Sequence, residues 1–233
     1  MLLYMPYFVL RWLRVNAPTA GSTNLPHRLW CIIFGLCAGI GLSIKPYYFL
    51  PALMVEAYWL APLLRSPKKA TGFLLVPETL ALAAAVATYA VHFFFLPQYA
   101  RQRFFDFFLP CMQSCYSGYN CELWTVLAMG GRRLEAFAAV VAIALAFLLR
   151  RQCSLLLPLS LWLVGGYFTF VWQCKGWDYQ LIPFATALSM LIAAETAILL
   201  RLSLIGLHPQ QWLTDAGVIE KHFERICRNV CFV

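Results

Sequence analysis

Four basic side chains in three short polar stretches are the residues of this sequence best suited to bind a phosphate. Lys45 lies in "KPYY", residues 45 to 48, in the middle of a long apolar run. Arg101 and Arg103 lie in "ARQRFFDFF", and Lys175 lies in "KGWDYQ". Guanidinium and ammonium groups form charge-assisted hydrogen bonds with phosphate oxygens. These four side chains are therefore the first candidates for binding an anionic headgroup.

Aromatic and acidic neighbours accompany these cations. Tyr47 follows Lys45 by two positions, and Asp178 and Tyr179 follow Lys175 within five residues. Two interpretations stay open for each stretch. "KPYY" and "KGWDYQ" are either polar tips of helical hairpins or parts of a binding site. The arginines belong either to a helix that anchors the chain in the membrane interface or to a phosphate site.

Three ionisable residues lie inside apolar segments, where a charge is unfavourable by several kcal/mol unless it is paired or hydrated. Glu56 is central in its segment, whereas His92 and Glu195 lie nearer to segment ends. Each is therefore a candidate functional residue. Glu78 follows Pro77 at a helix start, where a carboxylate interacts favourably with the positive end of the helix dipole, so we expect a capping role.

The cysteines and the known catalytic motifs give weaker signals. Of nine cysteines, Cys111, Cys115 and Cys121 form a C-x3-C-x5-C cluster in a polar stretch. The cluster lacks a fourth ligand and a C-x2-C pair, so we predict no metal site, and a disulfide in an oxidising compartment stays open. The chain has no glycine-rich phosphate loop, nucleophile elbow or HExxH motif, and no catalytic residue is assigned.

The composition indicates the environment in which these residues act. The chain has 233 residues, of which 62% are hydrophobic and only 12% are charged, and its mean hydropathy is +0.70. A soluble domain is about half apolar and about a quarter charged. The sequence therefore predicts a polytopic membrane protein. Its net charge of +8 fits loops beside anionic lipid, and we expect no nucleic-acid partner because no basic stripe with interleaved aromatic residues occurs.

Seven apolar segments, bounded by charges or turn residues, predict an all-α membrane helix bundle with short interfacial helices. The predicted segments are 2–10, 29–44, 49–64, 79–96, 134–149, 154–172 and 181–200. They belong to a membrane domain over residues 1–201, which precedes a cytoplasmic amphipathic tail over residues 202–233. A further short helix is expected in the interface after residue 96, where four phenylalanines accompany Arg101, Arg103 and Asp106.

The distribution of lysine and arginine predicts the orientation of the bundle. If the loop over residues 11–28 is cytoplasmic and each later segment crosses once, twelve of the 18 basic residues lie on the cytoplasmic side and six on the other side. This bias is the positive-inside pattern. It predicts that Lys45, Arg101, Arg103 and Lys175 share the external side.

Three of these stretches resemble one family. "GLCAGIGLSIKPYYFLPALMVEAYWL" is similar to the glycine-rich helix, the lysine-proline-aromatic turn and the following helix of bacterial membrane glycosyltransferases of the GT-C class. These are relatives of the protein mannosyltransferases and of the lipid A aminoarabinose transferase. "FFFLPQYARQRFFDFFLPCMQSCY" resembles the segment after a later span, and "QCKGWDYQLIPFATAL" resembles the late external loop. The resemblance covers most of residues 1 to 200.

The resemblance implies a transferase that takes a sugar from a polyprenyl-phosphate carrier at the external face of the bacterial inner membrane. The phosphate of the donor is the leaving group, so cations must stabilise its growing charge. The candidate residues for this lipid-phosphate site are Lys45, Tyr47, Arg101, Arg103, Lys175, Asp178 and Tyr179. A divalent cation is implied only for complete members of the family.

The sequence also departs from that family. In such transferases, acidic residues of the first external loop act as base or metal ligands, and we expect that loop to precede the first residue of this chain. Gln180 stands where many relatives are expected to have histidine. We therefore expect an incomplete or inactive member. The alternatives are a transporter or flippase-like protein, with Glu56 and His92 as relay groups, and a non-catalytic assembly subunit.

Overall fold

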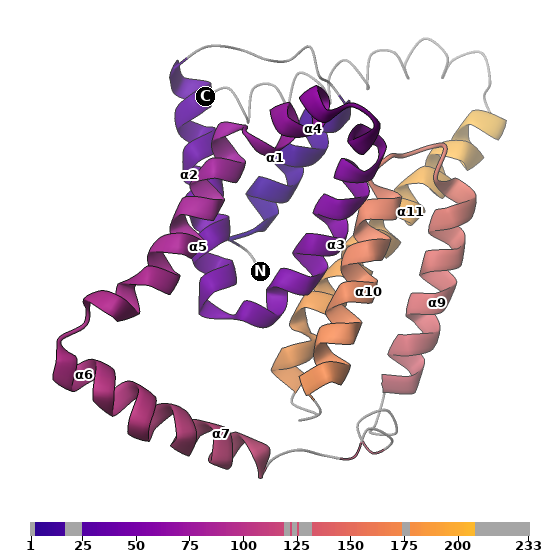
Figure 1. Cartoon of the computed structure of the whole chain (residues 1–233). Coiled ribbons are helices and arrows are strands. Elements are labelled where there is room, and N and C mark those ends of the chain that lie inside the picture. The colour runs from indigo at the N-terminus through magenta and orange to yellow at the C-terminus, as the bar shows by residue number, and fades with distance from the viewer. Residues whose placement is uncertain are drawn as a thin grey trace.

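The computed structural model describes residues 3–16, 25–118, 132–173 and 178–207, together with positions 122 and 125. Within these ranges all regular secondary structure is helical (Figure 1), which confirms the predicted all-α class. The elements are α1 (Met5–Asn16), α2 (Leu25–Ile44), η1 (Pro46–Tyr48), α3 (Phe49–Leu60), η2 (Ala61–Arg65), α4 (Pro67–Leu74), α5 (Pro77–Phe95), α6 (Gln98–Gln102), η3 (Arg103–Phe108), α7 (Leu109–Ser117), α9 (Arg132–Leu149), α10 (Leu156–Gln173), η4 (Asp178–Leu181) and α11 (Ile182–Leu207).

The long helices form two packed groups that α10 joins (Figure 1). In the first group α2 packs against α5, and the two run parallel because α3, η2 and α4 return the chain to the end where α2 began. In the second group α9, α10 and α11 pack together, and α10 also packs against α3. We name the end of the bundle that holds η1 the η1 end, and the opposite end, which holds α4, the α4 end.

Prolines determine where several of the helices start. Pro46, Pro67 and Pro77 each occupy a first-turn position of η1, α4 and α5. Proline fixes φ near the helical value, and its missing N–H is one that a helix start leaves unbonded in any case. The preceding residues Lys45 and Ser66 are extended, with φ/ψ of −134°/88° and −133°/96°, as proline requires of its predecessor. The chain therefore turns sharply before each of these helices.

Glycines allow α2 and α5 to approach closely. A Cβ on Gly35 would lie 2.2 Å from the carbonyl oxygen of Glu78 and 2.9 Å from the Cβ of Ala81. A Cβ on Gly39 would lie 2.6 Å from the Cβ of Ala85. The two glycines are four residues apart and face small residues, which is the arrangement by which membrane helices pack tightly without large side chains.

Four helical stretches are long and apolar enough to cross a membrane: Pro46–Arg65, Pro77–Phe95, Leu156–Gln173 and Ile182–Ser203. Arg28–Ile44 is apolar but shorter, and the first turn of α9 carries Arg132, Arg133 and Glu135. The structure thus indicates a membrane protein. The predicted count of seven membrane segments is not confirmed and stays a prediction, although each predicted segment overlaps a helix.

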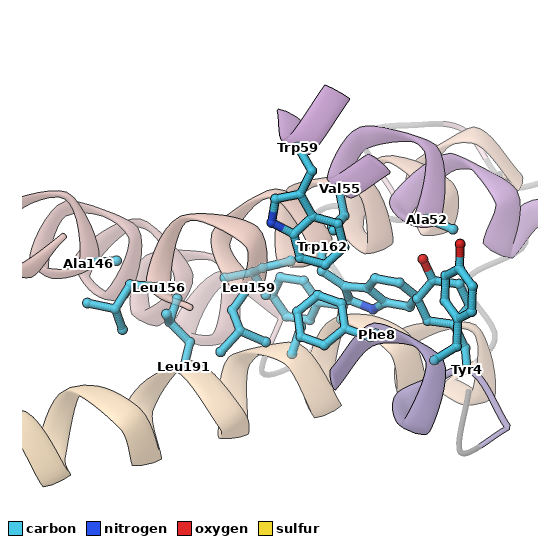
Figure 2. Packing of buried hydrophobic residues seen from close by; sticks show 14 of the residues in the cluster. Tyr4, Phe8, Ala52, Val55, Trp59, Ala146, Leu156, Leu159, Trp162 and Leu191 are labelled. Carbon is cyan, nitrogen blue, oxygen red and sulfur yellow. The ribbon is translucent and has the colours of Figure 1, made fainter. Parts of the chain in front are cut away.

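Aromatic side chains form the centre of the core (Figure 2). Tyr4 and Phe8, at the start of α1, pack against Trp162 of α10 with ring centroids 4.7 Å and 6.2 Å apart. Phe8 also lies 5.4 Å from Trp59 of α3. The aromatic residues at the start of the short helix α1 therefore pack against both α3 and α10 and connect these two helices.

The segment from α6 to α7 runs away from the rest of the bundle (Figure 1). Its rings reach back to the end of α5, where Phe93 lies 4.8 Å from Phe104 and 6.4 Å from Phe105 between ring centroids. Large apolar side chains such as Phe107 remain exposed. The helical part of the interfacial-helix prediction is confirmed, whereas its place in a membrane interface stays a prediction.

Two predicted boundaries differ from the structure. The first helix does not end before a loop at residue 11 but continues to Asn16, so Arg11 and Arg14 are helical rather than loop residues. At the other end α11 continues to Leu207, beyond residue 200, where the last apolar segment was predicted to end, and the domain division at 201 stays a prediction. In both places the helix runs past an arginine whose charge suggested a membrane border. The remainder of the predicted tail, 208–233, lies outside the described residues.

Candidate functional site

The "KPYY" stretch forms a tight turn at the η1 end. Lys45 precedes η1 and is half-buried, and its Nζ lies 6.0 Å from the ring centroid of Tyr48. The backbone N–H of Tyr48 donates to the carbonyl oxygen of Lys45 at 3.0 Å, which closes the turn. Tyr47 keeps about half of its surface exposed. The predicted hairpin turn is therefore present, with a cation and a phenol at its tip.

A chain of hydrogen bonds connects this turn to the ends of α10 and η4. The hydroxyl of Thr169 donates to the carbonyl oxygen of Tyr47 at 3.2 Å. The amide Nε2 of Gln173 donates to the carbonyl oxygen of Thr169 at 3.1 Å. The Nε2 of Gln180 donates in turn to Oε1 of Gln173 at 2.6 Å. We call Thr169, Gln173 and Gln180 the amide chain.

The last member of the amide chain is buried and incompletely bonded. Gln180 is only 4% exposed, and within the described ranges its Oε1 accepts no hydrogen bond. A buried acceptor without a partner is unfavourable by about 1–3 kcal/mol. In the sequence, Gln180 is notable only because relatives of the resembling family are expected to have histidine at this position. Its two hydrogen-bonding neighbours could not be foreseen, because they depend on how η1, α10 and η4 meet.

The two predicted arginines lie on the segment that leaves the bundle. Arg101 in α6 and Arg103 at the start of η3 are both exposed. The guanidinium of Arg103 lies 5.2 Å from the ring centroid of Tyr99. Asp106 is exposed as well, and none of these three residues makes an ion pair in the part of the chain that the structure describes. Their side chains are thus accessible to lipid or to a ligand.

The structure describes the remaining predicted site residues only in part. Lys175 lies outside the described residues. Asp178 and Tyr179 belong to the short helix η4, which packs against α10 and α11, but their side chains are outside the described part. Because α10 also contacts η1, the turn that holds these residues and the turn that holds Lys45 lie at the same end of the bundle. Whether the four cations surround one headgroup stays a prediction.

Four charged side chains form a second site toward the α4 end. Only two of them, Glu56 and Glu78, are candidates from the sequence. Arg11 donates from Nε and Nη2 to the two carboxylate oxygens of Glu56, at 3.2 Å and 2.7 Å. Arg14 donates from Nε and Nη2 to the two carboxylate oxygens of Glu78, at 2.6 Å and 3.0 Å. Nη1 of Arg11 is 4.0 Å from Oε1 of Glu78, which links the two pairs. We call these four residues the charge cluster.

The charge cluster is deeply buried at its centre. The side chains of Arg11 and Glu78 are 0% exposed. Arg11 also donates to the carbonyl oxygen of Phe73 at 3.0 Å, and its guanidinium lies 3.6 Å from the centroid of the Phe73 ring. Nη2 of Arg14 approaches Sγ of Cys31 at 3.8 Å. The cluster therefore joins α1 to α2, α3, α4 and α5 while its formal charges cancel.

These contacts decide what the acidic residues can do. Glu56, predicted as a central candidate, is held by both bonds from Arg11 and is not an isolated carboxylate. Glu78 does lie in the first turn of α5, as a capping residue should, but its carboxylate is also bound by Arg14. Bidentate pairing with arginine occupies both oxygens of a carboxylate and fixes the position of its side chain. The cluster is therefore suited to hold helices together rather than to transfer a proton.

A helical pattern could have identified Arg11. Tyr4, Tyr7, Phe8 and Arg11 are spaced as one face of a helix, and the first three are aromatic. An arginine that continues such a face is expected to be buried and to require a carboxylate partner. The short apolar run before Arg11 instead predicts a loop residue, because arginine after such a run is typical of a membrane border.

The other two candidate residues, His92 and Glu195, lie apart from the two groups of polar residues described above. His92 is half-buried near the end of α5; its Nδ1 contacts the carbonyl oxygen of Tyr89, and its ring centroid lies 4.0 Å from that of Phe93. Glu195 is buried in α11, and its Oε1 has no hydrogen-bond partner within the described ranges. Neither residue joins the amide chain or the charge cluster.

Two members of the cysteine cluster lie on α7, one helical turn apart. Cys111 and Cys115 are exposed free thiols. A hydrogen bond with Cys115 raises the pKa of the Cys111 thiol above its ordinary value, so its thiolate is disfavoured. Cys121 lies outside the described residues. In the described part of the chain, no three histidine, cysteine, aspartate or glutamate side chains are grouped so that they could hold a metal ion.

Comparison with known proteins adds no family or fold relative: no family model, no curated protein and no solved structure matches the chain.

Proposed function

We propose that the η1 end binds the phosphate headgroup of a polyprenyl-phosphate-linked sugar, as part of a GT-C-like membrane glycosyltransferase at the external face of the bacterial inner membrane. The observation that supports this proposal best is the bond from Thr169 to the carbonyl oxygen of Tyr47. This bond fixes the turn of Lys45 beside the end of α10, which leads to Lys175, Asp178 and Tyr179. The turn of Lys45 and the short helix η4 are thus at one end of the apolar helices.

The chemistry of a phosphate leaving group agrees with these residues. Lys45 is half-buried at the border of the apolar region, where an ammonium group is less screened by water than in a loop. A hydrogen bond between charged partners contributes about 1.5–3 kcal/mol. Arg101 and Arg103 are exposed on the segment that leaves the bundle (Figure 1), where a lipid phosphate beside the bundle can reach them. No residue is assigned as a base, so the proposal concerns binding of the donor.

The transporter alternative has less support. It needs Glu56 and His92 as relay groups that exchange protons or ions. Glu56 is occupied by two bonds from Arg11, and His92 is near the opposite end of its helix from the charge cluster. The two groups therefore do not form a connected path, and a phosphate-binding role of the η1 end is the better proposal.

Binding of a photoreactive polyprenyl phosphate to the protein in lipid nanodiscs tests the proposal. In Lys45→Glu, we expect about tenfold less labelling or more, because an attractive charge becomes a repulsive one. The matched control is Lys68→Glu, since Lys68 is exposed on α4 at the opposite end. Equal labelling of Lys45→Glu and the unaltered protein would rule out this role of the η1 end.

A further inference from the structure

We propose that Gln180 binds a hydroxyl group of the ligand at the η1 end, so that this end recognises a polyhydroxylated headgroup as well as its phosphate. The inference rests on the proposed function, because it takes the ligand to be a phosphate with such a group attached. The open acceptor is Oε1 of Gln180, which is buried and accepts no bond within the described ranges.

The hydrogen-bond partners determine which atom of Gln180 is open. The carbonyl oxygen of Thr169 can only accept, so the side-chain group of Gln173 that contacts it is the donor Nε2. The Oε1 of Gln173 then faces Gln180, and Gln180 must present its own Nε2. The oxygen of Gln180 is left as the free end of the chain. A ligand that completes the chain must therefore donate a hydrogen bond.

The surroundings favour a neutral donor over a cationic one. The amide chain begins at the carbonyl oxygen of Tyr47, two residues from the ammonium group of Lys45. A ligand amine would be positively charged, like the ammonium group of Lys45 at the same end, whereas a hydroxyl group is neutral. A hydroxyl on a phosphate-bearing ligand satisfies both the cation and the amide. Sugars and glycerol headgroups share this chemistry.

The location of Gln180 suits such contact. Gln180 lies in η4, between the end of α10 and the start of α11, at the border of two apolar helices rather than within them. A headgroup that sits at the membrane surface is at this level, whereas the charge cluster lies toward the opposite end of the bundle. The amide chain also bonds η1 to α10, so a ligand on Gln180 would stabilise the turn of Lys45.

Discrimination between two probes tests the inference. The probes are polyprenyl phosphate and the same lipid with a hexose on its phosphate, and their affinities are measured in phosphatidylcholine nanodiscs. For Gln180→Met, which keeps the side-chain length but removes the amide, we expect about tenfold weaker binding of the hexose-bearing probe and unchanged binding of the other. Gln152→Met is the matched control, because Gln152 is exposed in the turn between α9 and α10 at the opposite end.

The failure of this inference can be told apart from failure of the proposed function. If Lys45→Glu weakens the binding of neither probe, the proposed phosphate site is wrong and the inference fails with it. If Lys45→Glu weakens both probes while Gln180→Met weakens neither, or both equally, the phosphate site stands and the hydroxyl site is overturned. If Gln180→Met does not fold, Gln173→Met replaces it, because it removes the acceptor that orients the Gln180 amide and should cause the same selective loss.

A second membrane composition identifies the source of the hydroxyl. In phosphatidylglycerol nanodiscs, a lipid that itself carries hydroxyl groups is present in excess. If these groups occupy Gln180, binding of the hexose-bearing probe weakens in the unaltered protein and Gln180→Met removes the difference between the two membranes. If the sugar alone is the ligand, the selective effect of Gln180→Met is the same in both membranes. If the unaltered protein bound the two probes with equal affinity in phosphatidylcholine nanodiscs, the inference would be contradicted.

Discussion

The guanidinium group of Arg11 contacts two other helices, α3 and α4, at once. It binds both carboxylate oxygens of Glu56, donates to the carbonyl oxygen of Phe73 and lies over the ring of Phe73. An arginine with these partners is stable in a buried position, because each of its three nitrogen atoms donates to an acceptor. Removing one partner leaves the other charge buried and unpaired, which is strongly destabilising.

This arrangement predicts a large effect of Arg11→Met that a second substitution relieves. We expect Arg11→Met to lower the free energy of unfolding by about 3–5 kcal/mol, because Glu56 and Glu78 lose a buried counter-charge. Arg11→Met combined with Glu56→Met should be less destabilised than the sum of the two single variants, since the unpaired carboxylate is gone. Reversible unfolding of the detergent-solubilised protein measures all four free energies.

Arg201→Met provides the control for that cycle. Arg201 is exposed on α11, so its replacement should change stability by less than about 0.5 kcal/mol. Strictly additive effects of the Arg11 and Glu56 substitutions would show that the two side chains do not interact in the folded protein.

Among elements, the pair α2 and α5 depends on two small residues. Gly35 faces the backbone of Glu78, whose side chain in turn binds Arg14. Packing of these helices and the geometry of the charge cluster are therefore linked. A substitution at the contact of α2 with α5 should also shift the ion pair of Glu78 with Arg14, because the first turn of α5 takes part in the helix contact and carries Glu78.

Two glycine-to-alanine substitutions with opposite expected outcomes test this contact. For Gly35→Ala we expect a lower thermal unfolding midpoint, since the new Cβ would lie 2.2 Å from a backbone oxygen that cannot rotate away. For Gly72→Ala in α4, where nothing lies within 4 Å of the new Cβ, we expect a gain of about 0.5–1 kcal/mol from helix propensity. Equal midpoints of the two variants would contradict the close approach of α2 and α5.

The elements themselves were largely predictable. Every predicted apolar segment overlaps a helix, because a long apolar run can satisfy its backbone groups in a membrane only as a helix. The turn at Lys45 and Pro46 was predictable for a local reason, since proline restricts its predecessor. Arg11 was assigned wrongly to a loop because an arginine after a short apolar run is typical of a membrane border. Its partner Glu56 is 45 residues away, and a local pattern does not specify which carboxylate pairs with it.

At the scale of the whole molecule, the two groups of helices meet so that η1 and η4 lie at one end (Figure 1). The amide chain could not be predicted from sequence, because it requires residues of α10 and η4 to meet a carbonyl of η1. The distribution of basic residues predicts that this end is external. That orientation has a direct test.

We expect an impermeant maleimide to label Tyr47→Cys and Lys175→Cys in intact cells, in a background that lacks the nine native cysteines. Lys69→Cys, on exposed α4 at the other end, should react only after the membrane is opened. Reaction of Tyr47→Cys and Lys175→Cys from opposite faces would disprove a shared headgroup site. The Lys69→Cys variant also serves as the control for leakage of the reagent.

The neutrality of the charge cluster has a consequence for living cells. A membrane voltage acts on net charge, at about 2.3 kcal/mol per elementary charge per 100 mV if the charge crosses the whole field. Two guanidinium groups bound to two carboxylates form a unit without net charge, so an energised membrane pulls little on the short helix that holds both arginines. Loss of either arginine would leave one unpaired negative charge, on α3 or on α5, on which that field acts.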